Sequence, residues 1–280
     1  VQALGMDFGI WVEPEMVNED SGLYRAHPDW VLAPPDRPRT RGRSQLILDF
    51  TRKDVRDYIY ESLKPVFAQP GLSYVKWDMN RSLTEVWSAA LPAGRQGEVY
   101  HRFVLGVYEV LERLRRDFPH ILIEGCAGGG GRFDGGMLYY TPQIWCSDDT
   151  DAIERLKIQY GTSFAYPVST VGSHVSASPN HQTRRRTPLE TRGTVAMAGS
   201  FGYELDLSQM TEEEQDIIRH QVEEYKQYYD LIHNGKYYRL SSPYEDCRAT
   251  AWAFVSEDKK ECLFCAVMTK LQANPDAVII

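Results

Sequence analysis

The sequence predicts an α/β fold in which parallel strands close into a barrel. Short apolar runs alternate with amphipathic helical segments, a pattern typical of parallel sheets. Polar residues follow one predicted strand after another, which favours a barrel over an open sheet. The G-x-G-x-x-G fingerprint of open dinucleotide-binding sheets is absent.

Five short apolar runs are predicted to be buried strands, because each ends in a polar or Gly-rich turn. They are residues 8–12, 45–49, 74–77, 121–124 and 143–146.

Three segments have the spacing of amphipathic helices. A helix from 211 to 234 should begin with a capping box formed by Thr211 and Glu214 and end at Gly235. The other two are residues 51–67, with Val55, Ile59, Leu63 and Val66 inward, and residues 98–118, with Val99, Phe103, Val107, Leu111 and Leu114 inward.

The character of the chain changes after about residue 240. Residues 248–255 and 262–268 are predicted as two strands joined by a charged turn at 256–261. We therefore expect residues 1–240 to form the barrel and residues 241–280 to begin a β-rich C-terminal domain.

Composition excludes several classes of partner. The 280 residues carry a net charge of −8, which disfavours nucleic acid and anionic membranes as partners. An aromatic share of 12% favours a neutral polar ligand such as a sugar. Five cysteines, an odd number without framework spacing, indicate a reducing compartment, and the cytoplasm is predicted.

Cysteine, histidine and glycine patterns indicate no cofactor. Cys262 and Cys265 are interpreted as core residues, since no second ligand pair follows at zinc spacing. His174 and His181 also lack metal-ligand spacing and are predicted to be structural. The glycines of residues 125–132 fit a tight turn or a close approach to a ligand better than a phosphate loop.

Two carboxylates at strand ends suggest glycosidase chemistry. Asp78 ends the run 73–80, and Asp148 lies in the acidic segment 143–151. Such hydrolysis needs a carboxylate to attack and an acid to protonate the leaving oxygen. Lys76 is expected to keep Asp78 ionised, and neighbouring acids to raise the pKa of Asp148. The alternative is that residues 148–151 form a solvated, helix-capping turn.

Other polar residues near strand ends leave two interpretations open. Trp11 fits either a sugar-stacking face or the core, and Arg43 fits either a ligand hydroxyl or a nearby acid. Glu13 and Glu15 fit a site or an ordinary loop. The basic run 184–186 is predicted to be solvated.

Five ordered segments, taken together, resemble the α-galactosidases of glycoside hydrolase family 36. The resemblance runs through nearly the whole chain. The segments are Phe8-Gly-Ile-Trp-Val-Glu-Pro-Glu-Met16, Lys76-Trp-Asp-Met-Asn-Arg81, Glu124-Gly-Cys-Ala-Gly-Gly-Gly-Gly-Arg-Phe-Asp134, Trp145-Cys-Ser-Asp-Asp-Thr-Asp151 and Phe201-Gly-Tyr-Glu-Leu-Asp-Leu207.

The resemblance implies a (β/α)8 barrel and a retaining double displacement on terminal α-linked galactose, as in melibiose and raffinose. It implies Asp78 as nucleophile and Asp148 as acid/base, with their carboxyl groups about 5 to 5.5 Å apart. It also implies a homo-oligomeric parent enzyme with no metal or nucleotide cofactor. The residues that fall where the family contacts galactose are Trp11, Arg43, Lys76, Asn80, Cys126 and Gly128.

Departures from the family pattern lead us to expect a fragment. The chain enters at what would be the third barrel strand, so the first two strands are absent and six remain, ending near residues 201–203. Arg184 replaces an expected glycine. Alternatives are action on α-linked N-acetylgalactosamine, which Cys126 disfavours, galactosyl transfer, or a non-catalytic sugar-binding role.

Overall fold

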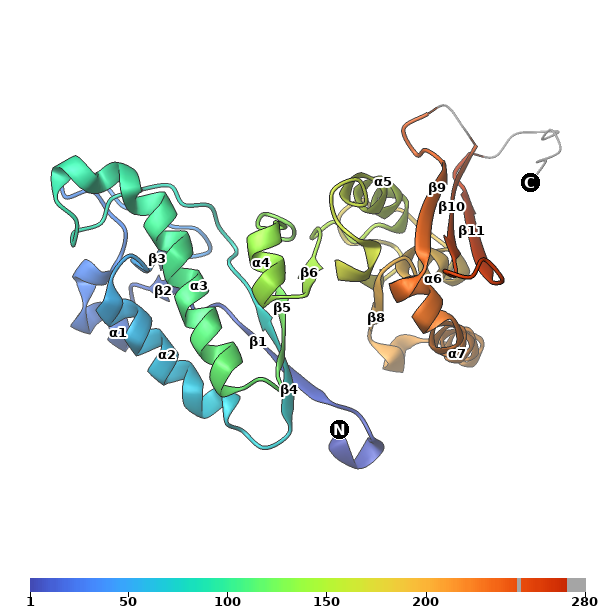
Figure 1. Ribbon diagram of the computed structural model, residues 1–280, viewed down its shortest axis with the longest axis horizontal. Coiled ribbons are helices and arrows are strands. Elements are labelled where there is room, and N and C mark those ends of the chain that lie inside the picture. The colour runs from blue at the N-terminus through green and yellow to red at the C-terminus, as the bar shows by residue number, and fades with distance from the viewer. Residues whose placement is uncertain (246–247, 271–280) are drawn as a thin grey trace. The chain divides into compact units, whose positions relative to one another are not determined.

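The computed structural model describes residues 1–245 and 248–270 (Figure 1). The chain divides into two compact units, residues 1–144 and 145–280, and each is described by itself. Within the described ranges, no helix combines the length and the apolar character that crossing a membrane requires.

The first unit contains a parallel sheet, as the alternation of strands and helices predicted. Its strands are β1 (Phe8–Val12), β4 (Leu72–Trp77), β5 (Leu122–Gly125) and β6 (Gln143–Trp145), in the spatial order of their numbers. All their pairings are parallel. The carboxyl ends of the strands therefore meet at one edge.

One layer of polar side chains crosses this sheet. Trp11 on β1 pairs in register with Lys76 on β4, Lys76 with Glu124 on β5, and Glu124 with Gln143 on β6. Residues in register on parallel strands have side chains on the same face. Asp78 follows two residues after Lys76 and so belongs to the next layer, at the carboxyl edge.

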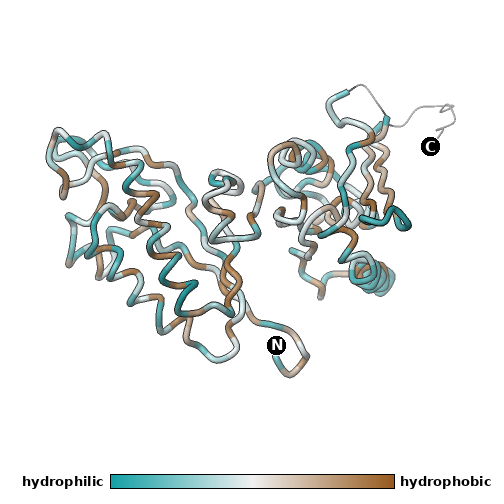
Figure 2. The backbone as a smooth tube through the Cα atoms, in the orientation of Figure 1, coloured by the Kyte–Doolittle hydropathy of each residue, from teal (hydrophilic) through white to brown (hydrophobic). Residues whose placement is uncertain are grey.

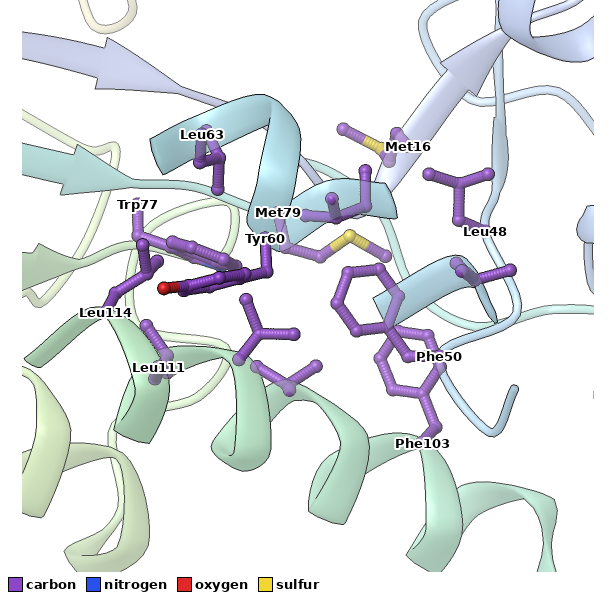
Figure 3. Close-up of a cluster of buried hydrophobic side chains, with 14 of the residues drawn as sticks. Met16, Leu48, Phe50, Tyr60, Leu63, Trp77, Met79, Phe103, Leu111 and Leu114 are labelled. Carbon is purple, nitrogen blue, oxygen red and sulfur yellow. The ribbon is translucent and has the colours of Figure 1, made fainter. Parts of the chain in front are cut away.

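Two helices pack on each other beside this sheet: α2 (Lys53–Phe67) and α3 (Val99–Asp117). Their predicted inward residues are buried, except that Val66 is only half-buried. Apolar residues recur along both helices and in the strands (Figure 2), and buried side chains from these segments form the core drawn in Figure 3. At Gly106 a Cβ atom would lie 2.1 Å from the carbonyl oxygen of Phe50, so this close approach of α3 requires glycine.

The prediction that residues 45–49 form a strand of the parallel sheet is wrong. β3 (Gln45–Ile47) pairs antiparallel with β2 (Met16–Asn18) in a separate two-stranded sheet. Leu46, Ile47 and Leu48 are buried as expected. Apolar character predicts burial, but it does not say which strand is the partner.

The second unit contains the parallel pair β7 (Val171–Ser176) and β8 (Ser200–Glu204). β8 confirms the strand expected near residues 201–203, whereas β7 was missed because it contains glycine, serine and histidine. The unit also holds α5 (Ala152–Thr162), α6 (Leu189–Ala196) and α7 (Glu212–Asn234). The predicted capping box begins α7, and Gly235 ends it in an extended conformation.

An antiparallel sheet follows α7, in the order β11-β10-β9, and confirms the two predicted strands. Its bounds are β9 (Lys236–Ser241), β10 (Ala249–Val255) and β11 (Cys262–Met268). Cys265 is buried, but Cys262 is exposed because residues three apart on a strand face opposite sides. The prediction of a core residue is therefore wrong for Cys262. Cys247 lies outside the described residues.

Short elements complete the described chain. They are α1 (Gly22–Ala26), α4 (Gly135–Tyr140) and the 3-10 turns η1 (Gln2–Leu4), η2 (Pro28–Trp30), η3 (Ala93–Glu98), η4 (Val168–Thr170) and η5 (Leu207–Gln209).

Candidate active site

Asp78 directly follows β4 at the carboxyl edge of the sheet. Its backbone N–H donates to the carbonyl of Val12 at 2.9 Å, which extends the ladder between β1 and β4. The side chain is only 5% exposed. Three nitrogen donors hold the carboxylate: Trp11 Nε1 at 3.0 Å and Asn80 Nδ2 at 2.8 Å to Oδ2, and Met79 N at 2.8 Å to Oδ1.

The pKa of Asp78 is lowered below its ordinary value. Burial by itself raises this pKa, but hydrogen bonds from Trp11, the Cys126 thiol, Asn80 and the Met79 N–H outweigh it. The carboxylate is therefore ionised at neutral pH, as a nucleophile must be. Hydrogen bonds are the main cause of the lowered pKa of Asp78, whereas the sequence had predicted Lys76 in that role.

Cys126 is a neutral donor in this cluster. Burial and the Asp78 charge raise the pKa of its thiol to about 12, so the proton stays on sulfur. Its backbone N–H donates to Trp77 O at 2.8 Å, and its carbonyl accepts from Met79 N at 3.1 Å. These bonds continue the pairing of β4 and β5 past the strand ends and place the thiol against Asp78.

The glycine run after Cys126 forms the predicted tight turn. Gly128 and Gly129 have φ of +54° and +79°, in the left-handed region that disfavours a side chain. The Ala127 N–H donates to Gly129 O at 2.8 Å and closes the turn. A Cβ atom on Gly128 would meet nothing within 4 Å, so the backbone conformation and not crowding selects glycine there.

The structure distinguishes between the alternatives left open for Trp11 and Arg43. Trp11 is 49% exposed, so the alternative that it fills the core is wrong. Arg43 forms an ion pair with Glu13 at 3.2 Å, the acid-pairing alternative. Glu13 also accepts from Asn80, whose amide thereby bridges Glu13 and Asp78.

A buried ion pair beneath the site was not predicted. Glu15 is fully buried, accepts from Trp77 Nε1 at 2.7 Å, and contacts both terminal nitrogens of Arg132 at 2.9 Å. The pair joins the loop after β1 to the loop after β5. Its only signal in the sequence is a charged residue within an apolar or glycine-rich run.

Lys76 has a buried partner within the polar layer. Its Nζ lies 3.8 Å from Oε1 of Glu124, and Gln143 Nε2 donates to Oε2 of Glu124 at 3.0 Å. Burial raises the pKa of Glu124 to about 7. This carboxyl was also not predicted.

Asp148 lies in the loop between β6 and α5 of the second unit. Its side chain is exposed, and Oδ1 accepts from Trp145 Nε1 at 3.1 Å. Arg155, buried and missed by the sequence analysis, organises this loop. It donates to the carbonyls of Ser147 and Asp149, each at 2.6 Å, and its guanidinium lies 4.2 Å from the Trp145 ring.

The acidic turn is helix-capping, as one alternative held, but not fully solvated. Asp151 is 1% exposed and accepts from the N–H groups of Ile153 and Glu154 at the start of α5. Arg185 pairs with both Asp151 and Glu154. The prediction that the basic run is solvated holds for the exposed Arg184 and Arg186, whereas Arg185 is only partly exposed because it pairs with two acids.

Two further predictions concern single residues of this unit. The His174 ring packs on Trp145 with ring centroids 4.6 Å apart, and His181 is exposed, so the structural role of these histidines stays a prediction. Within the described part of the chain, no cluster of His, Cys, Asp or Glu has metal-ligand geometry. Arg184 has φ of +62°, the conformation that favours the expected glycine.

The first unit thus gathers the predicted residues around Asp78. Trp11, Asn80 and Cys126 contact its carboxylate, Arg43 is linked to it through Glu13 and Asn80, and Gly128 shapes the adjoining turn. Asp148 belongs to the second unit.

Comparison with known proteins identifies the family. The sequence pattern of the family described as Melibiase matches residues 1–235. The chain belongs to the melibiase family. Its α/β fold also matches that family's structures: a crystal structure of a GH36 α-galactosidase, AgaA from Geobacillus stearothermophilus, superposes with a TM-score of 0.96 at 54% identity, covering 98% of this chain and 38% of that one.

Curated relatives share the similarity over the whole chain. α-Galactosidase AgaA from G. stearothermophilus is 56% identical over 98% of this chain and 37% of its own length. The bifunctional α-galactosidase/sucrose kinase AgaSK from Mediterraneibacter gnavus is 52% identical over 100% of this chain and 29% of its own. The chain therefore spans about a third of the length of these relatives.

Proposed function

We propose that this member of the melibiase family is a retaining α-galactosidase that releases terminal α-linked galactose from galacto-oligosaccharides. One observation carries the proposal: a buried aspartate at the carboxyl edge of a parallel sheet is kept ionised by Trp11, Asn80 and Cys126. Active sites of (β/α)8 enzymes lie at this edge. Relatives named α-galactosidases, one of them crystallised in complex with raffinose, support the same activity.

Asp78 and Asp148 divide the reaction between them. The Asp78 carboxylate attacks the anomeric carbon and forms a covalent glycosyl-enzyme, while Asp148 gives its proton to the departing oxygen. Asp148 then removes a proton from water, which attacks the same carbon and frees Asp78. Two inversions give net retention. The mechanism requires the carboxyl groups to lie about 5 to 5.5 Å apart, and a crystal structure with a bound galactose analogue measures this distance.

The remaining predicted residues bind the sugar. The half-exposed Trp11 presents a ring face for stacking, and Lys76, Arg43 and Asn80 offer donors to hydroxyl groups. Cys126 and Gly128 place thiol and backbone against the 2-hydroxyl side. The buried thiol, held on Asp78, leaves little room for a 2-acetamido group.

The proposed activity also implies how the chain is divided into domains. Residues 1–240 form strands 3 to 8 of a (β/α)8 barrel, and residues 241–245 and 248–270 belong to a β-rich C-terminal domain. The parallel pairings in both units support this assignment. The parent enzyme is a cytoplasmic homo-oligomer, and the free thiols at Cys126, Cys146, Cys262 and Cys265 fit a reducing compartment.

Azide rescue of two variants tests the assignment. Asp78→Ala should abolish hydrolysis of an aryl α-galactoside, and azide, entering the space on the β face, should restore turnover and yield the β-azide. Asp148→Ala should still form the glycosyl-enzyme, so azide should yield the α-azide. The assigned roles would be overturned if the two variants gave each other's azide, or if both variants gave an azide of the same configuration. Galactose binding without any turnover by the unsubstituted protein would indicate a sugar-binding module instead.

A further inference from the structure

Glu124 is a buried carboxyl group that the attack by Asp78 does not use. Its side chain is 2% exposed, and Oε1 has no hydrogen-bond partner within the described ranges. Burying a carboxylate with an unsatisfied oxygen is costly, because its hydration is lost without replacement. Packing alone would be served better by an apolar residue, so the position calls for another reason.

The layer around Glu124 supplies that reason. Lys76 and Gln143 lie beside it on the neighbouring strands, in register and on the same face. Lys76 Nζ is 3.8 Å from Oε1, and about a quarter of the Lys76 side chain remains exposed. Gln143 Nε2 donates to Oε2 at 3.0 Å and to the Tyr74 hydroxyl at 3.3 Å, so the carboxyl group is itself held.

We propose that Glu124 is a positioning residue that holds the Lys76 ammonium in place for a hydroxyl group of the bound sugar. A lysine side chain has a flexible four-carbon stem and loses much conformational entropy when its ammonium binds a ligand. In its ionised form Glu124 is a buried counter-charge that removes that freedom before the sugar arrives. The proposal rests on the proposed function, and Glu124 does not touch the reacting atoms.

A double-mutant cycle with Glu124→Gln and Lys76→Met tests the role. We expect Glu124→Gln to raise KM for an aryl α-galactoside about tenfold and to change kcat less than about twofold. If Glu124 acts through Lys76, the double variant should match Lys76→Met alone. Effects that multiply, or a fall in kcat with unchanged KM, would overturn the proposal.

Glu109→Gln is the matched control. Glu109 forms an ion pair with Arg56 at 2.9 Å on the helical side of the first unit, outside the polar layer. The substitution removes the same charge from an ion-paired glutamate, and KM and kcat should stay unchanged. A rise in KM equal to that of Glu124→Gln would show a general charge effect and contradict the positioning role.

A titration separates this proposal from the proposed function. The carbon-13 shift of the Glu124 carboxyl can be followed against pH in the unsubstituted protein and in Lys76→Met, without any turnover. Loss of the neighbouring cation should raise the pKa of Glu124 in the variant. An unchanged midpoint would refute the pairing even in an active enzyme, whereas a shifted midpoint in a protein without turnover would refute only the proposed function.

Discussion

Trp11 Nε1 donates a hydrogen bond to Asp78 Oδ2 at 3.0 Å, from a side chain whose ring is half exposed. One tryptophan thus serves two purposes. Its N–H stabilises the ionised Asp78 carboxylate, the proposed nucleophile, and its half-exposed ring is the proposed stacking face for a sugar.

Trp11→Phe separates these two purposes. Phenylalanine keeps an aromatic face but has no donor, so the Asp78 carboxylate loses a hydrogen bond worth about 1.5 kcal/mol and its pKa should rise. The acidic limb of the kcat/KM profile against pH should therefore move to higher pH. Trp252→Phe is the control, since the buried Trp252 Nε1 has no hydrogen-bond partner in the described structure. An acidic limb that does not move in Trp11→Phe would contradict the role of the N–H.

Arg155→Met should weaken the second unit. The substitution keeps most of the stem but leaves the carbonyls of Ser147 and Asp149 without their donor. We expect the free energy of unfolding to fall by about 3 kcal/mol, measured by urea denaturation. Arg186→Met, at an exposed position, should change it by less than about 0.5 kcal/mol. Equal effects of the two substitutions would argue against the organising role of Arg155.

Arg184→Gly should stabilise the protein. The left-handed φ of +62° strains any residue with a Cβ atom and suits glycine. After the entropy that glycine loses on folding, we expect a gain of about 0.5 to 1 kcal/mol in the free energy of unfolding. Arg184→Ala removes the side chain but keeps the strain, so it should show no gain. A gain from alanine as large as that from glycine would place the cause in the side chain.

Glu124 should make stability depend on pH. Its pKa rises from 4.5 to about 7 on folding, because burial disfavours the charged form. The protonated form of Glu124 therefore adds to the free energy of unfolding. This contribution is fully present below pH 4.5, the pKa in the unfolded chain, and is lost as pH rises through about 7. The loss amounts to about 3 kcal/mol.

Glu124→Gln tests this dependence, because glutamine does not titrate. The free energy of unfolding of the variant minus that of the unsubstituted protein should increase as pH rises from about 5 to 8, because only the unsubstituted protein loses stability. A constant difference across this range would show that Glu124 does not titrate there.

Local patterns in the sequence were sufficient for much of the fold. The inward faces of α2 and α3 and the capping box of α7 depend on residues within a few turns of one another, and the structure confirms them. The position of Asp78 after an apolar strand is local in the same sense. Its place at the sheet edge follows from the parallel order of strands and helices.

Contacts between distant segments required the tertiary structure. Residues 45–47 pair with 16–18 outside the parallel sheet, because an apolar run specifies burial but not its partner. Lys76 meets Glu124 through strand register, and the buried Arg155 finds its carbonyl acceptors through the folding of a loop. Periodicity reports the face that a residue occupies, whereas ion pairs and hydrogen bonds depend on which segments meet. The sequence by itself therefore determined the family motifs and the candidate nucleophile, and tertiary packing decided how that nucleophile is held.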